Sequence, residues 1–334
     1  MSSGPQMTGE VSSKLLQLRK ALNNVLYGQE DLVDKVLIGL LSRGHLLLEG
    51  LPGLGKTELV KGLARTLSLE AKRVQFTPDL LPGDITGNPV LQEIDGRRQF
   101  VFQKGPIFAN LLLADEINRA SPKTQSALLE AMQERKVTVM GETHELPAPF
   151  FVLATQNPIE LEGTYPLPEA QLDRFLFKLQ VPRNSVPVLQ KIILNREIGQ
   201  EPEVATVMSA DDLIGFCDAA RQIHLPESVA NYIARLVDAT HEGPAAAGVK
   251  FGASPRAALA LAAASRSAAL LAGRPNASFE DVEALAVPVL AHRVVLDYTA
   301  RLSGLHSADV VQAILKATPR QDKAPADVFK AAKV

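Results

Sequence analysis

Short apolar runs alternate with helical patterns through the first half of the chain. Each run has the length and the hydrophobic content of a buried strand. Because strands that alternate with helices pair in parallel, this half of the chain predicts a parallel sheet wrapped by helices. The expected strands are 45–49, 73–76, 111–115, 150–155 and 175–181.

The segments between these runs are of two kinds. Residues 56–67 and 122–133 repeat apolar side chains at the three- and four-residue spacing of an amphipathic helix. Residues 89–106 and 137–149 instead carry a turn-forming glycine between two short alternating runs. We predict that the first pair are helices that connect strands, and that the second pair are β-hairpins inserted into the α/β core.

The second half of the chain has a different composition. After residue 183 the sequence is rich in Ala, Leu and charged residues at helical spacing, interrupted by prolines. This pattern predicts a small all-helical domain over 184–317, following an α/β core over 15–183. The polar ends, 1–14 and 318–334, are expected to be flexible tails.

Composition restricts the classes of function. The 334 residues, 46% of them hydrophobic, are enough for two cores. With 35 basic and 37 acidic residues the net charge is −2, so the chain lacks the global basic field that attracts nucleic acid or anionic membranes. A single cysteine, Cys217, and the lack of a signal-peptide pattern or a membrane-length apolar segment lead us to expect a cytoplasmic protein.

The clearest chemical motif follows the first expected strand. Residues 50–57, GLPGLGKT, have the G-x-x-x-x-G-K-[ST] spacing of a phosphate-binding loop, between a strand and a helix as that motif requires. Backbone N–H groups of such a loop converge on phosphate oxygens, and the helix N-terminus adds a favourable dipole. Lys56 would bridge the β- and γ-phosphates of ATP, and the Thr57 hydroxyl would ligate Mg²⁺. Nucleotide contacts are expected from Gly50, Gly53, Leu54, Gly55, Lys56, Thr57 and Glu58.

A second motif ends the expected strand 111–115. Asp115 and Glu116 place two carboxylates at the end of a buried run, which is costly unless a cation is near. Asp115 would hold Mg²⁺, and Glu116 could act as the general base that deprotonates water. Such a pair can also be a plain strand exit, but the upstream phosphate loop favours the metal site. The sequence has no N-K-x-D, H-E-x-x-H or G-x-G-x-x-G motif for a Ras-type GTPase, zinc protease or dinucleotide site.

With these motifs in place, the sequence resembles the AAA+ ATPases and, within them, the MoxR family. The resemblance covers about residues 15–317. It implies an AAA+ α/β core followed by a helical lid, and it identifies the two inserted hairpins as the family's helix-2 insert and pre-sensor-1 hairpin. The similar motifs are ATQNP at 154–158, which resembles sensor 1, ELEGTYPLPEAQLDRF at 160–175, FTPDLLPGD at 76–84, KGP at 104–106 and ADEINRA at 114–120.

The resemblance also implies catalytic roles for residues outside the two motifs. Asn157 would place its amide beside the γ-phosphate, although an Asn before a proline can also be a simple turn residue. Arg174 lies in the arginine-finger segment and would reach the γ-phosphate bound to a neighbouring subunit. The alternative for Arg174 is a surface pair with Asp173. Arg119 could also face the adjacent subunit.

Further nucleotide contacts are implied at two places. Arg256 follows a Ser-Pro helix start, where a positive charge is unfavourable unless an anion is near, and this suits the sensor 2 role. A solvated arginine is the alternative. Residues 25–30 resemble the segment that lines the adenine pocket, with Tyr27 and Gly28 as the expected contacts, although a turn at a helix start is the simpler interpretation.

Together these features predict Mg²⁺-dependent ATP hydrolysis at the subunit interface of a ring of identical chains, expected to be a hexamer. The resemblance implies chaperone-like maturation or activation of a client protein, often one with a von Willebrand factor A domain. Two alternatives stay open. The mixed basic and aromatic residues of 97–102 could grip a polypeptide or a nucleic-acid strand, or could form a plain amphipathic hairpin with one packed face. The net charge of −2 disfavours a nucleic-acid motor. A nucleotide-gated scaffold with negligible turnover is disfavoured by the presence of Glu116, Asn157 and Arg174.

Overall fold

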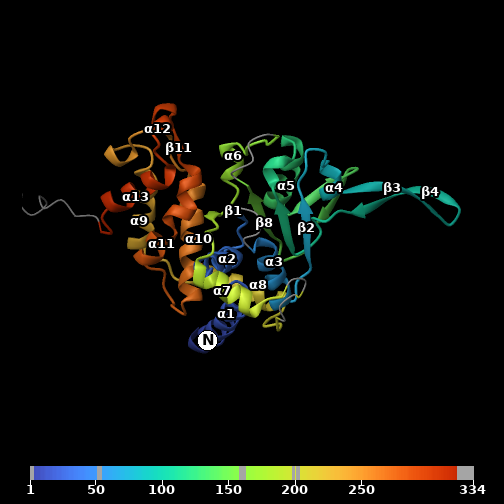
Figure 1. Cartoon of the computed structure of the whole chain (residues 1–334), viewed down its shortest axis with the longest axis horizontal. Helices are drawn as coiled ribbons and strands as arrows, with labels where there is room; N and C mark the ends of the chain where they lie inside the picture. The colour runs from blue at the N-terminus through green and yellow to red at the C-terminus, as the bar shows by residue number, and fades with distance from the viewer. Residues whose placement is uncertain (1–3, 51–54, 158–162, 198–199, 201–203, 322–334) are drawn as a thin grey trace, which may run out of the picture.

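The chain folds into a sheet-containing core and a helical body beside it (Figure 1). The computed structural model describes residues 4–50, 55–157, 163–197, 200 and 204–321, with the side chains described from residue 11 onward. Within these residues, no helix is both long and apolar enough to cross a membrane.

A five-stranded parallel sheet forms the centre of the core, in the order β2-β5-β8-β1-β9. Every expected strand is confirmed, with ends shifted by one or two residues. The order places β8 between β1 and β5, so the ends of the strands that precede the phosphate loop and the two carboxylates lie on either side of it. The strands are β1 (Leu46–Glu49), β2 (Ala71–Gln75), β5 (Leu111–Asp115), β8 (Phe151–Gln156) and β9 (Phe177–Gln180).

Helices cover both faces of the sheet because its strands are apolar at consecutive positions. One face, with Leu46, Leu48, Leu111, Leu113 and Leu153, packs against α1 (Gly4–Val25), α2 (Glu30–Leu41) and α3 (Lys56–Thr66). The other face, with Leu47, Leu112, Ala114, Val152 and Ala154, packs against α4 (Pro82–Thr86) and α5 (Pro122–Glu134). The two expected helices are therefore confirmed as α3 and α5.

The first helix corrects the expected flexible tail over 1–14. Helix α1 begins at Gly4, so residues 4–14 are helical. Val11, Leu15, Leu18 and Leu22 recur at helical spacing and are buried, and α1 contacts α2, α3 and α10. The polar residues between them hide this pattern in the sequence, whereas burial of the apolar side explains why the segment is ordered.

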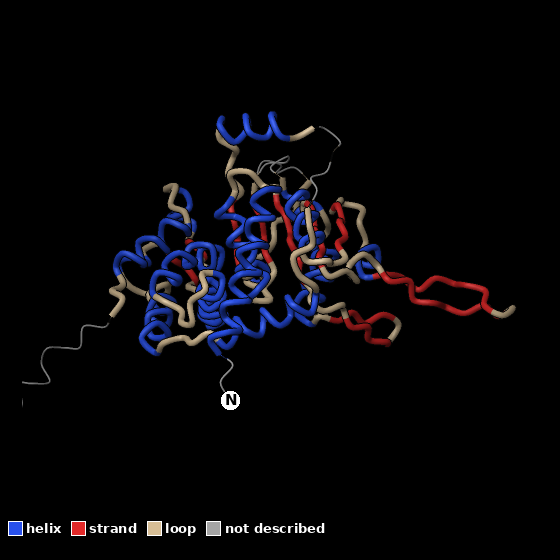
Figure 2. Tube along the Cα trace, turned by 90° about the horizontal axis from the view of Figure 1, so that it is seen from below, coloured by secondary structure: helices blue, strands red, loops and turns tan. Residues whose placement is uncertain are grey.

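Both expected hairpins are present. Strands β3 (Gly87–Ile94) and β4 (Arg97–Lys104) form a long antiparallel hairpin that projects away from the core (Figure 2). Strands β6 (Lys136–Val139) and β7 (Glu142–Glu145) form a shorter one. The two contact each other near their bases, where the ring of Phe102 stacks on His144 with centroids 4.2 Å apart.

The C-terminal body, α8 to α13, is helical but not all-helical as expected. Val249–Phe251 (β10) and Val295–Leu296 (β11) form a two-stranded antiparallel sheet, as their β-branched and aromatic residues favour. The body consists of α8 (Ala210–Gln222), α9 (Glu227–Asp238), η2 (Pro244–Ala246), α10 (Pro255–Leu271), α11 (Phe279–Leu290), η3 (Ala291–Arg293), α12 (Tyr298–Leu302) and α13 (Ser307–Ala317). Two shorter elements in the core are η1 (Ile117–Arg119) and α6 (Glu169–Leu172), and α7 (Val186–Asn195) precedes the body.

The beginning of the expected C-terminal tail is held against this body. Arg320 forms ion pairs with Glu280 and Glu283 of α11, both at 2.6 Å. Arg235 of α9 donates to the carbonyl of Pro319 at 2.8 Å. Residues 318–321 are therefore anchored by charge and hydrogen bonding, and residues 322–334 lie outside the described chain.

Two histidines, His45 and His292, are buried, and burial lowers the pKa of each. His45 accepts the N–H of Val152 at Nδ1 (3.0 Å) and places Nε2 3.1 Å from the carbonyl of Met132. Burial lowers the pKa of His45 from 6.5 to about 4, and it lowers the pKa of His292 well below its ordinary value. Between these pH values the unfolded chain binds more protons than the folded one, so folding is favoured by deprotonation.

We expect the free energy of unfolding to fall as the pH drops from about 6.5 to about 4, by up to about 1.4 kcal/mol per pH unit for each histidine, and to be fully retained above that window. Urea denaturation across this range measures it. His45→Gln keeps a donor and an acceptor but does not titrate, so its profile should be flatter than that of the wild type. Identical pH dependence of the two proteins would contradict this role of His45.

Candidate active site

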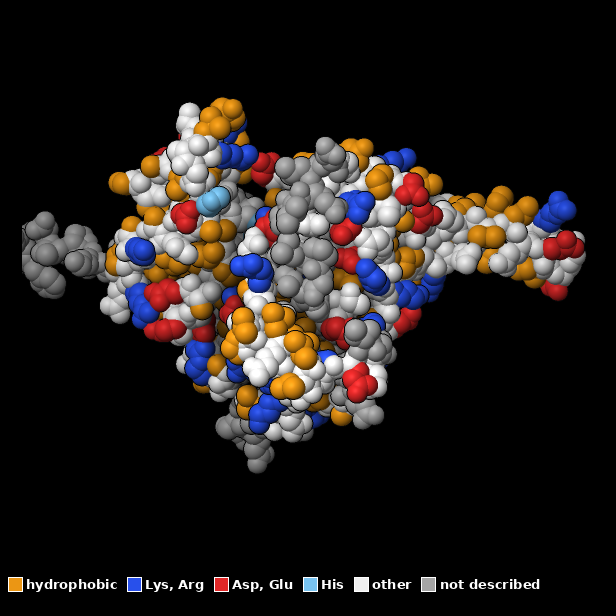
Figure 3. All heavy atoms as spheres, viewed as in Figure 1, with side chains coloured by type: hydrophobic (Ala, Val, Ile, Leu, Met, Phe, Trp, Pro, Cys, Tyr) orange, Lys and Arg blue, Asp and Glu red, His pale blue; other side chains and the backbone are white. Residues whose placement is uncertain are grey.

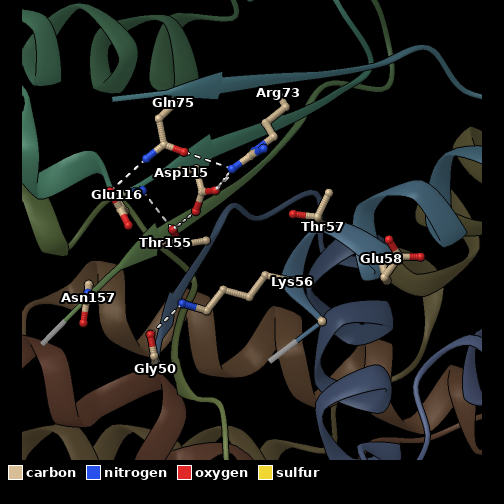
Figure 4. Close-up of a pocket in the computed structure, with 11 residues that line it drawn as sticks. Gly50, Lys56, Thr57, Glu58, Arg73, Gln75, Asp115, Glu116, Thr155 and Asn157 are labelled. Atoms are coloured by element: carbon tan, nitrogen blue, oxygen red, sulfur yellow. Dashed lines mark hydrogen bonds and ion pairs between the residues drawn. The ribbon is translucent and has the colours of Figure 1, made fainter. Parts of the chain in front are cut away.

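A cleft lies at the carboxyl edge of the sheet, where β1, β5 and β8 end (Figure 4). It brings together the described residues of the phosphate loop, the two carboxylates and Asn157, as expected. Gly53 and Leu54 lie outside the described residues. The lining residues are Gly50, Gly55, Lys56, Thr57, Glu58, Arg73, Gln75, Asp115, Glu116, Thr155 and Asn157.

The phosphate loop ends in a backbone conformation that suits glycine. Gly55 has φ +85° and caps the N-terminus of α3, which begins at Lys56. The ammonium group of Lys56 donates to the carbonyl of Gly50 at 2.7 Å. Burial lowers the pKa of Lys56, while the nearby carboxylates of Asp115, Glu116 and Glu49 act in the opposite direction. A cation and a helix N-terminus therefore face the same cleft.

Both carboxylate oxygens of Asp115 have partners. Oδ1 accepts the hydroxyl of Thr155 at 2.6 Å. Oδ2 accepts two N–H groups of Arg73, from Nη2 at 2.7 Å and from Nε at 3.2 Å. The side chain of Asp115 is 17% exposed, so a positive group beside it offsets the cost of a largely buried charge.

Glu116 is held in an unusual conformation. Its φ of +56° lies in the left-handed region, which is rare for a residue with a side chain. Its N–H donates to the Thr155 hydroxyl at 2.9 Å, and its Oε2 accepts from Gln75 (2.8 Å) and Arg119 (3.0 Å). The strained backbone and three hydrogen bonds turn this carboxylate in a defined direction at the cleft.

A chain of hydrogen bonds connects the two carboxylates. Arg73, bonded to Asp115, also donates to Gln75 Oε1 at 3.0 Å, and Gln75 donates to Glu116. Sequence reasoning missed Arg73, Gln75 and Thr155. These residues reach the site through the register of the sheet, in which Gln75 of β2 pairs with Asp115 of β5. That register depends on pairing between distant strands and cannot be read from the sequence alone.

Asn157 lies immediately beyond the strand that separates the two motifs. It follows β8, between the ends of β1 and β5, and the residue is 9% exposed. It therefore lines the same cleft as Lys56 and Glu116. An amide there can donate to an anion on one side and orient a water molecule on the other.

Arg174 and Arg256 are not among the residues that line this cleft. Arg174 donates to the carbonyl of Leu129 at 3.2 Å and to Gln133 Oε1 at 2.7 Å, both on α5. Asp173 does not take Arg174 as its partner. Its carboxylate bonds instead to Arg256 (3.2 Å) and Arg293 (2.7 Å) of the C-terminal body.

Tyr27 and Gly28 lie beneath α7 and outside the lining of the cleft. The Tyr27 ring carries Lys191 Nζ 4.5 Å and the Arg196 guanidinium 5.4 Å from its centroid. Gly28 has φ +69°, and a Cβ there would lie 2.3 Å from Val188. Close packing of α7 therefore requires a glycine at this position, whatever else the segment binds.

The donors at the cleft fit Mg²⁺ that arrives with a nucleotide. Thr57 and Asp115 offer hard oxygen ligands, and Asp115 already accepts a cationic guanidinium in this structure. Among the described residues, no cluster of three His, Cys, Asp or Glu side chains could hold a metal by itself. One carboxylate and one hydroxyl, completed by phosphate oxygens and water, is the usual protein environment of Mg²⁺.

Comparison with known proteins agrees with the fold. A family model described as "ATPase family associated with various cellular activities (AAA)" matches residues 45–177, and one described as "AAA lid domain" matches residues 244–314. A crystal structure of a protein from Cytophaga hutchinsonii superposes with a TM-score of 0.87 at 38% identity, covering 94% of this chain and 97% of that one.

Relatives with names extend over most of the chain. Chaperone MoxR1 of Mycobacterium tuberculosis is 43% identical over 326 residues, 93% of this chain and 85% of the relative. The YeaC protein of Bacillus subtilis is also 43% identical, over 89% of this chain and 91% of its own. Protein MoxR of Paracoccus denitrificans is 32% identical over 83% of this chain and 87% of its own. On the combined evidence of sequence, fold and site, the chain belongs to the MoxR family of AAA+ ATPases.

Proposed function

We propose that this chain hydrolyses ATP with Mg²⁺ at the interface between copies in a ring, and that the resulting movement remodels or activates a client protein. The proposal rests on the observation that the predicted catalytic residues do not all lie at one cleft of a single chain. Lys56, Asp115, Glu116 and Asn157 meet at one cleft, whereas Arg174 lies outside it. A complete site then needs the arginine of a second copy.

Each residue of the cleft has a defined part in phosphoryl transfer. Lys56 and the N-terminus of α3 would neutralise and hold the phosphates. Thr57 and Asp115 would hold Mg²⁺, which supplies charge neutralisation at the phosphate oxygens. Asn157 would orient the attacking water beside the γ-phosphate.

Glu116 is the group best placed to take the proton of that water. Its carboxylate accepts hydrogen bonds from Gln75 and Arg119, which hold it at the cleft. Arg119 thus acts first on the Glu116 of its own chain, and we assign its second role, toward a neighbour, to the assembled ring.

Arg174 is suited to act on a neighbouring copy. Its guanidinium is partly exposed, and its bonds within the described chain go to neutral oxygens on α5. It therefore keeps its full positive charge for a phosphate presented by another cleft. Arg256 pairs with Asp173, the residue before Arg174, and we propose that Arg256 too senses nucleotide at the interface between copies.

Exposed apolar side chains provide surfaces for assembly and for a client. Figure 3 shows them gathered over α7, where Val186, Leu189, Ile193 and Leu194 are exposed, and we place this helix near a neighbouring copy. Leu91 and Phe100, paired across the projecting hairpin, are also exposed, as is Met140 in the turn of the second one.

Exposed apolar side chains on projecting hairpins suit contact with a polypeptide. We propose a protein client, with a separate chain that carries a von Willebrand factor A domain as the leading class and a hexamer as the assembly. A nucleic-acid motor is the alternative, and binding that falls steeply with salt concentration would favour it.

Glu116→Gln should bind ATP with nearly wild-type affinity but hydrolyse it about 100-fold or more slowly, because the amide cannot accept the proton of water. Steady-state phosphate release and equilibrium binding of labelled ATP measure the two properties. Lys56→Ala is the control that should lose binding itself. Retained tight binding by Lys56→Ala would contradict the phosphate-loop assignment, and full turnover by Glu116→Gln would contradict its role as the base.

Arg174→Ala should keep ATP binding but lose about 100-fold or more of its turnover, as other arginine fingers do. Mixing it with Lys56→Ala should restore part of the activity, since Lys56→Ala chains supply an intact Arg174 to intact clefts. Lys56→Ala mixed with Glu116→Gln is the matched control and should stay inactive. Failure of the first mixture at concentrations where mixed rings form would argue against action between copies.

A further inference from the structure

The segment that carries Arg174 is held by the C-terminal body. Residues 173–176 connect α6 to β9, and η3 lies against them. The contact is made by Arg293, the last residue of η3, whose side chain is 3% exposed. A fully enclosed arginine at the junction of the two bodies requires an explanation, because burial of a charge is costly unless it is paired and hydrogen-bonded.

Every N–H group of the Arg293 guanidinium has an acceptor. Nε donates to Asp173 Oδ1 at 2.7 Å, and Nη2 donates to the carbonyls of Asp173 (3.2 Å) and Phe175 (2.7 Å). Nη1 donates to the carbonyls of Leu176 (3.2 Å) and Val289. Five donors meet five acceptors, four of them on residues that flank Arg174. A lysine has three donors and no planar fork, so it cannot reproduce this set.

Neighbouring contacts make the arrangement rigid. His292 Nε2 lies 3.1 Å from the same Phe175 carbonyl. The second oxygen of Asp173 accepts from Arg256, and the N–H of Leu176 is bonded to the carbonyl of His45 at 2.7 Å. The main chain on both sides of Arg174 is therefore fixed, while the side chain of Arg174 itself extends to α5.

We propose that Arg293 is a positioning residue for Arg174. Through Arg293, the orientation of the C-terminal body determines the position in which Arg174 is presented to the next copy. This rests on the proposed action of Arg174 between copies. Arg293 does not line the cleft of its own chain. Its loss therefore alters turnover in the neighbouring site and leaves the binding of ATP by its own chain unchanged.

The test uses Arg293→Lys in the full-length chain. We expect turnover to fall about tenfold to 100-fold, as for other small displacements of a catalytic group, with the dissociation constant for ATP within about twofold of the wild type. Arg274→Lys is the matched control, because Arg274 also pairs with an aspartate of the C-terminal body, Asp281, but does not touch residues 173–176. It should retain wild-type turnover.

A double-mutant cycle separates positioning from general stability. If Arg293 acts through Arg174, the variant with both Arg174→Ala and Arg293→Lys is no slower than Arg174→Ala alone. Losses that multiply would overturn the proposal. If Arg174→Ala itself retains full turnover while Glu116→Gln loses it, the action of Arg174 between copies fails and the proposal falls with it, although ATP hydrolysis stands.

Mixed rings test the supply of the arginine directly. Chains with Lys56→Ala should rescue Arg174→Ala chains, whereas chains with both Lys56→Ala and Arg293→Lys should rescue them about tenfold less well or not at all. Equal rescue by both donors would overturn the proposal. If Arg293→Lys does not assemble, Arg293→Gln decides by the same criterion, since its amide keeps two N–H donors but not the five of the guanidinium.

Discussion

Two adjacent carboxylates at the end of a buried strand are the constraint on which this structure depends. An uncompensated charge there would cost several kcal/mol, so Asp115 and Glu116 require partners from neighbouring elements. The strand order supplies these partners. On one side of β5, strand β2 contributes Arg73 and Gln75. On the other side, beyond β8, strand β1 leads into α3, which begins with Lys56. This cluster of opposite charges balances without a ligand, and the proposed binding of nucleotide and Mg²⁺ would use the same groups.

The second dependence is between the two bodies. The C-terminal body reaches the core through buried polar contacts at residues 173–176 rather than through apolar packing alone, with Arg293 enclosed between them. Hydrogen bonds weaken steeply when their distances or angles change, so a small rotation of the C-terminal body would shift residues 173–176 or break their bonds to Arg293. Because Arg174 is part of it, the structure connects the orientation of one chain's C-terminal body with chemistry proposed for the next chain.

Local patterns explain which parts of this structure could be predicted. The strands, α3, α5 and both hairpins depend on residues close together in sequence, and each was confirmed within a few residues. Features that depend on distant pairing were missed. Thr155 and Gln75 join the site through the sheet register, Asp173 takes partners more than 80 residues away, and β10 pairs with β11 across a long separation. The start of α1 was missed because its apolar positions are separated by many polar residues.

The measurement that tests the account most directly is the ATPase rate per chain as a function of chain concentration, with and without Mg²⁺, alongside the mass distribution of the same samples with ATP. A site completed by a second copy predicts a Mg²⁺-dependent rate per chain that rises with concentration as larger assemblies form. A Mg²⁺-dependent rate that stays constant from isolated chains to full assemblies would contradict a shared site. It would return Arg174 to a structural role at the surface of α5.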